Sequence, residues 1–170
     1  MNNLQKASKS LSSKVIASRS LNVMFADFSY FNRHTINTLY VPLGIGLIAQ
    51  YAKQIFGSQI DVSLYKKVDE FFELTNNKAP DVVGLSVYYW NKALNQYVVD
   101  RLRKMFGKDV TIVLGGPCID SNKKQQIKFL TKTFPCADVI AINEGELSFN
   151  SIIRRLVEGK KSEAFKDPID

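Results

Sequence analysis

Short runs of apolar, largely β-branched residues alternate along this sequence with longer segments whose apolar residues recur every three or four positions. This alternation of strand and helix patterns predicts repeated βα units that form a parallel sheet. The runs are almost continuously apolar, which is typical of strands covered by helices on both faces of the sheet. The predicted strands are residues 21–26, 60–65, 82–87, 110–114 and 139–142.

The segments between and after these runs have the period of helices with one apolar face. The predicted helices cover about residues 41–55, 68–76, 94–105, 127–134 and 149–157. Repeated βα units in this order are typical of a flavodoxin-like (Rossmann-like) α/β fold. The sheet is then doubly wound, parallel and five-stranded, of order 2-1-3-4-5, with right-handed crossovers.

A chain of 170 residues is long enough to bury one core and short for two. Residues 1–20 hold four Lys or Arg and no acid, and we predict a flexible basic leader there. Residues 21–158 form the predicted α/β domain. Residues 159–170 are predicted to be a charged tail, which would lead into a catalytic domain if the chain is part of a longer enzyme.

Composition narrows the class of protein. Much of the net charge of +7 resides in the leader, and no zinc-finger spacing or RNA-binding aromatic signature accompanies it, so we do not expect a nucleic-acid partner. No stretch approaches the roughly 20 apolar residues of a membrane span, so no membrane partner is expected. Two cysteines, Cys118 and Cys136, are too few for a disulfide framework, which favours a cytoplasmic protein.

In folds of this kind, ligands bind outside the carboxyl ends of the strands, where the strand order reverses. The loops that should meet there are residues 27–41, 86–92, 115–121 and 143–146. Gly115-Gly116-Pro117 would let the backbone approach a bulky ligand or would simply make a tight turn. If they line a ligand groove, Gly116→Val should block the ligand and leave the fold intact. Ser86 would place a small hydroxyl at the end of the third strand.

The sequence Asn143-Glu144-Gly145-Glu146 leads from the last predicted strand into the last helix. Asn143 as the N-cap and Glu146 three residues later fit a capping box, in which each side chain accepts from a free backbone N–H near the other. Gly145, or one of the carboxylates, would also suit a ligand contact. The two roles are compatible.

The loop after the first strand is rich in aromatic residues, among them Phe28, Tyr30 and Tyr40. These rings would either form a lid over a flat ligand or anchor the loop to the body of the domain. Gly44 and Gly46 follow in the first helix, and each weakens a helix by about 1 kcal/mol relative to alanine. That cost indicates close approach of a neighbour or of a ligand.

The order and spacing of several short motifs resemble the cobalamin (B12)-binding domain that precedes the catalytic barrel of many radical-SAM enzymes. The resemblance covers about residues 21–157. Its motifs are residues 42–46 (Pro-Leu-Gly-Ile-Gly), 80–86 (Pro-Asp-Val-Val-Gly-Leu-Ser), 114–117 (Leu-Gly-Gly-Pro), 137–138 (Ala-Asp) and 144–146 (Glu-Gly-Glu).

The resemblance implies a module that binds cobalamin with its corrin ring over the carboxyl edge of the sheet and its nucleotide tail descending beside the strands. Ser86, Gly115 and Gly116 would line the tail groove, and residues 27–41 and 88–91 would face the ring. In full enzymes of this family an adjacent barrel holds a 4Fe-4S iron–sulfur cluster and S-adenosyl-L-methionine, and the cobalt often relays a methyl group. The cofactor-binding residues expected in all are Tyr40, Pro42, Leu43, Gly44, Ser86, Val87, Tyr88, Gly115, Gly116, Pro117, Asn143, Glu144 and Gly145.

Two departures from the family pattern limit what this chain can do alone. The Asp-x-His-x-x-Gly motif that supplies a lower cobalt ligand in part of the family is missing, because Phe28-Ser29-Tyr30 follows Asp27. We therefore expect cobalamin without a histidine ligand, and His34 as a surface loop residue. The chain also lacks the clustered cysteines of a radical-SAM barrel. It is expected to hold no catalytic residue and no metal ligand, and to need such a barrel in cis or in trans.

Other functions of related folds fit less well. Residues 44–49 match the dinucleotide pattern G-x-G-x-x-G/A, but they lie far beyond the end of the first strand. A phosphoryl-accepting receiver needs Asp in place of Ser86 and Lys in place of Asn143, and an FMN site needs a phosphate-binding loop in place of the aromatic one. One alternative stays open, a degenerate domain of the B12-binding fold that lacks cobalamin and acts as a scaffold or recognises a substrate or partner.

Overall fold

A computed structural model describes residues 19–29 and 41–159 of the chain. Five strands of these residues form one sheet of order β2-β1-β3-β4-β5, and every pair of neighbours is parallel. The predicted flavodoxin-like α/β fold is therefore confirmed. The strands are β1 (Leu21–Ala26), β2 (Ile60–Tyr65), β3 (Val82–Ser86), β4 (Thr111–Gly115) and β5 (Val139–Ile140).

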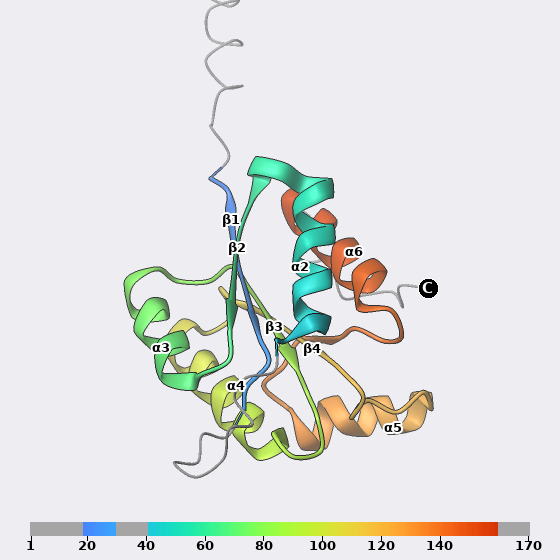
Figure 1. The fold of residues 1–170 in the computed structure, drawn as a ribbon. Helices are drawn as coiled ribbons and strands as arrows, with labels where there is room; N and C mark the ends of the chain where they lie inside the picture. Colours follow the sequence, from blue (N-terminus) through green and yellow to red (C-terminus); the bar gives the residue numbers. More distant parts are fainter. Residues whose placement is uncertain (1–18, 30–40, 160–170) are drawn as a thin grey trace, which may run out of the picture.

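Helices flank both faces of the sheet. Those of the described residues are α2 (Leu43–Phe56), α3 (Val68–Asn77), α4 (Lys92–Phe106), α5 (Lys123–Lys128) and α6 (Gly145–Val157), with a 3-10 turn η2 (Gly57–Gln59) after α2 and a π-helical turn η3 (Phe129–Thr133) after α5. α2 and α6 pack on one face, and α3, α4 and α5 pack on the other (Figure 1). None of these helices has the length and apolar content to cross a membrane.

The interior strand β1 shows how the apolar runs produce two cores. It pairs with β2 and β3 in a register that sets Val23 beside Val62 and Val82. Successive side chains of a strand point to opposite faces. Phe25 consequently packs under α2 and α6, whereas Met24 packs under α3 and α4. The apolar residues of β1, which are all of its residues except Asn22, are thus distributed over both faces of the sheet.

The predicted boundaries differ from the observed ones mainly late in the chain. β5 is only two residues long, Val139–Ile140, instead of the predicted 139–142. α5 begins at Lys123, because Asn122 caps it by accepting a hydrogen bond from the backbone nitrogen of Lys124 at 2.9 Å. Its first turn is entirely polar, so apolar periodicity could not reveal it. The predicted helix at 127–134 is the end of α5 together with η3.

Candidate functional site

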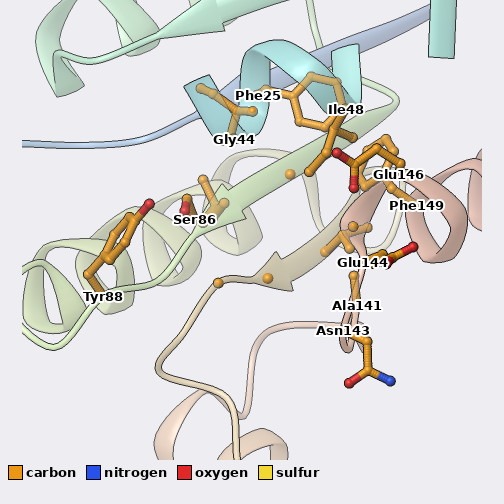
Figure 2. A pocket seen from close by; sticks show the side chains of 17 residues that line it. Phe25, Gly44, Ile48, Ser86, Tyr88, Ala141, Asn143, Glu144, Glu146 and Phe149 are labelled. Atoms are coloured by element: carbon orange, nitrogen blue, oxygen red, sulfur yellow. The ribbon is translucent and has the colours of Figure 1, made fainter. Parts of the chain in front are cut away.

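A pocket of about 240 Å³ opens at the carboxyl edge of the sheet, where the ends of β3 and β4 face the first turns of α2 and α6. Ser86 and Tyr88 lie on the β3 side, and Ile48, Glu146 and Phe149 lie across from them (Figure 2). Sites for drug-sized ligands enclose about 300–1,000 Å³. The pocket is therefore suited to one part of a large ligand.

Eight of the thirteen predicted site residues line this pocket. They are Gly44, Ser86, Tyr88, Gly115, Gly116, Asn143, Glu144 and Gly145. Pro42, Leu43, Val87 and Pro117 do not line it; Val87 is wholly buried and Leu43 is exposed. Tyr40 lies outside the described residues, as does His34. The pocket lies at the predicted edge, next to β1 and β3, where the strand order reverses.

The floor of the pocket is aromatic, and it was not predicted. Phe25 on β1 and Phe149 on α6 pack with ring centroids 4.5 Å apart. A β-carbon on Gly84 would lie 2.8 Å from the Phe25 ring and 2.9 Å from the Phe149 ring. Both rings therefore pack directly on Gly84 of β3, where a side chain would leave them no room. A glycine inside a predicted strand is a recognised signal of such close approach.

Two glycines of the pocket wall have room around them. Among the described residues, a β-carbon on Gly44 would meet no neighbour within 4 Å, and one on Gly115 would meet Ala141 alone, at 3.9 Å. Gly46 is equally open. Of the two reasons predicted for glycine in this helix, close approach of a neighbour finds no support among the described residues, and close approach of a ligand stays a prediction. Packing within the domain does not require glycine at Gly44 or Gly115. Their missing side chains leave the pocket wide.

Gly116 is required by the backbone itself. Its φ is +102°, and a β-carbon there would lie 2.9 Å from both the backbone nitrogen and the oxygen of Val87. Val87 N also donates to Gly115 O at 2.7 Å, so the backbones after β3 and β4 lie side by side here. The expectation that Gly116→Val would leave the fold intact is therefore wrong, because the added side chain collides with the backbone of Val87 before any ligand is considered.

The junction of β5 and α6 also corrects a prediction. Asn143 has φ +61°, and the N-cap of α6 is Glu144, whose side chain makes no capping hydrogen bond. Asn143 cannot form the predicted capping box from a left-handed backbone, because an N-cap is normally extended. Its side chain points away from the pocket (Figure 2). Gly145 is closely approached, since a β-carbon there would lie 2.5 Å from Ile48 Cδ1.

An aromatic stack and a partly buried carboxyl group lie at the exits of β3 and β1, and of their residues Tyr88 lines the pocket. Tyr88 stacks on Trp90 with ring centroids 4.5 Å apart and an interplanar angle of 14°. Asp27 follows β1, and burial raises the pKa of its carboxyl group although nearby Lys66 opposes the shift. The described residues contain no cluster of three His, Cys, Asp or Glu side chains that could hold a metal ion.

Comparison with known families decides what kind of domain this is. The family model described as the B12 binding domain matches residues 31–153, which is well over half of the chain. The chain belongs to the B12-binding domain family. The pocket of this B12-binding domain lies within the matched span, apart from Phe25.

Two curated relatives are methyltransferases by name. The cobalamin-dependent radical SAM methyltransferase TokK of Streptomyces tokunonensis is 31% identical over 144 residues, which cover 81% of this chain and 19% of TokK. An uncharacterised methyltransferase of Pyrococcus horikoshii is 22% identical over 131 residues, which cover 76% of this chain and 28% of that protein. The chain thus spans less than a third of either relative.

A crystal structure of a cobalamin-binding protein from Desulfitobacterium hafniense DCB-2 has the same fold. It superposes with a TM-score of 0.55 at 19% sequence identity, over 81% of this chain and 59% of that one. At this identity the likeness establishes the fold of the B12-binding domain and nothing finer.

Proposed function

We propose that this B12-binding domain binds cobalamin and serves as the cofactor module of a B12-dependent radical-SAM enzyme that transfers a methyl group. The observation that carries the proposal is the pocket at the carboxyl edge, walled by Gly44 and Gly115, whose absent side chains no packing contact demands. The names of TokK and of the Pyrococcus relative support the radical-SAM and methyl-transfer parts. By itself the chain is not expected to catalyse a reaction.

The residues of the pocket fit one end of a corrinoid. The open glycine wall admits a flat group, and the Phe25–Phe149 floor gives that group an apolar surface. Ser86 would offer a hydroxyl, and Gly115 and Gly116 would let the backbone approach the nucleotide tail. Tyr88 at the mouth would lie toward the ring. Cobalamin, when bound, supplies a cobalt centre that can carry a methyl group.

We further propose that cobalamin binds without a histidine ligand to cobalt. His34 is the only histidine of the chain, and Asp27 is followed by Phe28-Ser29-Tyr30 where a ligating motif would place its histidine two positions on. The 4Fe-4S cluster and S-adenosylmethionine would belong to a barrel in cis or in trans, since Cys118 and Cys136 cannot supply three clustered thiolates.

Exposed apolar residues next to the pocket support such a neighbour. Each lies within two positions of a pocket-lining residue in the sequence, and each is more than half exposed: Leu43 and Leu47 on α2, Tyr89 and Trp90 after β3, and Leu147 on α6. Contiguous exposed apolar surface marks an interaction site. A barrel closing over the carboxyl edge would cover these side chains.

We keep the cytoplasm as the proposed location of the protein, and we expect neither nucleic acid nor a membrane as its partner.

Titration of the purified chain with hydroxocobalamin, followed by absorbance and by the fluorescence of Trp90, tests the proposal. Trp90 is the only tryptophan, and its partner Tyr88 lines the pocket, so a bound corrinoid should quench it. We expect saturable uptake at a ratio of one to one. Cobinamide, which lacks the nucleotide tail, should bind more weakly. Absence of uptake in every cobalt oxidation state would refute the proposal and favour a scaffold that has lost the cofactor.

A further inference from the structure

Asn91 stands at the N-cap of α4, yet its side chain does not cap the helix. The residue is wholly buried, and its φ of −104° and ψ of 7° differ from the extended backbone usual for an N-cap. An N-cap asparagine normally accepts a hydrogen bond from the second or third N–H of its helix. No such bond is present here. The buried amide therefore serves other contacts.

The side-chain amide of Asn91 makes four hydrogen bonds, two accepted by its oxygen and two donated by its nitrogen. Asn91 Oδ1 accepts from the backbone nitrogen of Tyr88 at 2.8 Å and from Asn95 Nδ2 at 2.8 Å. Asn91 Nδ2 donates to the backbone oxygens of Phe28 at 3.0 Å and Ser86 at 3.1 Å. The backbone partners leave no ambiguity about the orientation of the amide, because an N–H can only donate and a C=O can only accept.

The amide joins two strand exits that are distant in sequence. Phe28 follows β1, Ser86 ends β3, and Tyr88 begins the loop to α4. Ser86 and Tyr88 line the pocket, whereas Asn91 does not. Asn95, one helical turn further along α4 and also wholly buried, donates to Ser86 O at 3.2 Å. It therefore supports the same strand exit as Asn91.

We propose that Asn91 is a positioning residue of the pocket, which holds residues 86–90 against the β1 exit so that Ser86 and Tyr88 face the ligand. Asn91 touches no ligand; it acts through the backbone of the two residues that line the pocket. Within this segment Val87 bonds through its backbone to Gly115 and Cys118 after β4. The side chain of Asn91 adds the link to the β1 exit, through Phe28 O. The part of the inference that concerns cobalamin rests on the proposed function, and the part that concerns the loop does not.

The chain contains a matched control for a test of this role. Asn22 is also buried, and its Nδ2 donates to two backbone oxygens, those of Ala79 at 3.0 Å and Lys78 at 3.4 Å. Asn22 lies near the start of β1, at the opposite edge of the sheet from the pocket. Asn91→Leu and Asn22→Leu each replace a buried amide by an apolar group of similar shape. Both should lower the melting temperature.

Two measurements, made well below the lower melting temperature, separate positioning from stability. We expect Asn91→Leu to change the near-ultraviolet circular dichroism and emission of Trp90, because the stack on Tyr88 is released, and to weaken hydroxocobalamin binding at least about tenfold. Asn22→Leu should leave both unchanged. If Asn91→Leu does not fold, Asn91→Ser, which is smaller and cannot overpack, is judged by the same criteria.

The outcomes of these measurements distinguish failure of the positioning role of Asn91 from failure of the proposed function. A variant at Asn91 that keeps the Trp90 spectra and the affinity of the unchanged chain would overturn the positioning role. Equal effects of Asn91→Leu and Asn22→Leu would overturn it too, since general destabilisation would then explain the loss. If the unchanged chain binds no cobalamin, the proposed function fails, and the Trp90 spectra of the ligand-free proteins alone decide the role of Asn91.

Discussion

Arg103 on α4 and Asp138, just before β5, form an ion pair with Nη2 and Oδ2 2.6 Å apart, and only 13% of each side chain is exposed. Asp138 Oδ2 also accepts from the backbone nitrogen of Ile112 at 2.8 Å, and Arg103 donates to the backbone oxygen of Cys136. The pair thus secures β5, the shortest strand, to its neighbour β4. The end of β5 leads into the pocket.

Removal of the arginine should destabilise the domain strongly. Arg103→Met keeps the aliphatic stem but leaves the largely buried Asp138 carboxylate with only the exposed Lys108 ammonium, 3.4 Å from Oδ1. Breaking a buried ion pair costs about 3 kcal/mol of the free energy of unfolding, and the remaining lysine should keep the loss at or below that value. Chemical denaturation followed by far-ultraviolet circular dichroism measures this loss. Glu70→Gln breaks the exposed Lys67–Glu70 pair as a control and should cost less than about 1 kcal/mol. Similar losses in both variants would contradict the structural role of Arg103.

Gly44 and Gly46 provide a matched test of the pocket wall. Both lie in α2, and no residue of the described part of the chain comes within 4 Å of a β-carbon at either position; of the two, Gly44 lines the pocket. Leucine at either position should not destabilise the helix, since glycine is the poorer helix former by up to about 1 kcal/mol. We expect Gly44→Leu to weaken hydroxocobalamin binding at least about tenfold and Gly46→Leu to change it less than about twofold. Equal affinities in both variants would exclude Gly44 from the ligand site.

The two neighbouring glycines after β4 should respond differently to alanine. Gly116→Ala places a β-carbon 2.9 Å from the backbone of Val87 at a positive φ, and we expect it to lower the free energy of unfolding by about 1–3 kcal/mol. Gly115→Ala has its nearest contact at 3.9 Å and should change that free energy by less than about 1 kcal/mol. Weaker binding with unchanged stability is the expected result for Gly115→Ala. Thermal unfolding and titration of both variants check the contrast.

Asp27 should make the domain less stable at neutral than at acidic pH, relative to an uncharged variant. Burial raises the pKa of its carboxyl group above the ordinary value of 3.8, so the folded state holds this proton more tightly than the unfolded state. The contribution to stability is present below pH 3.8 and is lost as the pH rises through the folded-state pKa. We therefore expect Asp27→Asn to gain stability over the unchanged chain at pH 7 and to match it near pH 3. Denaturation at both values tests the sign, and a gain confined to low pH would contradict it.

His34 should have no influence on cobalt ligation. A histidine bound to cobalt displaces the benzimidazole of cobalamin and changes the absorbance spectrum of the complex. We expect the spectra of the hydroxocobalamin complexes of the unchanged chain and of His34→Ala to coincide. An imidazole-type spectrum that disappears in His34→Ala would refute the proposed mode of binding.

The fold followed from local patterns because they repeat and agree with one another. Apolar runs that recur between amphipathic segments admit few other arrangements, and the observed strand order is the predicted one. The strand from Leu21 to Ala26 has the predicted limits. Where the pattern was polar or short, as at Lys123 in α5 or in β5, the limits were wrong.

Most of the correctly predicted residues of the candidate site lie next to a strand exit, and Gly44, in the first turn of α2, is the exception. Ser86 and Gly115 are found from topology alone, because the carboxyl ends of parallel strands share one edge. Phe25, Gly84 and Phe149 were missed, since they come from three separate elements and meet only after folding.

The sequence alone determined a doubly wound α/β fold, because hydrophobic periodicity and the order of its elements are properties of neighbouring residues. The B12-binding type entered as a resemblance of its motifs to that family, which the family match confirmed. Only the tertiary structure decided what each glycine is for. At Gly116 a side chain would collide with the backbone of Val87, and at Gly84 and Gly145 it would collide with side chains from other elements. At Gly44 and Gly115 the described residues leave room for a side chain. The difference depends on atoms brought together from distant parts of the chain, and no local pattern encodes those distances.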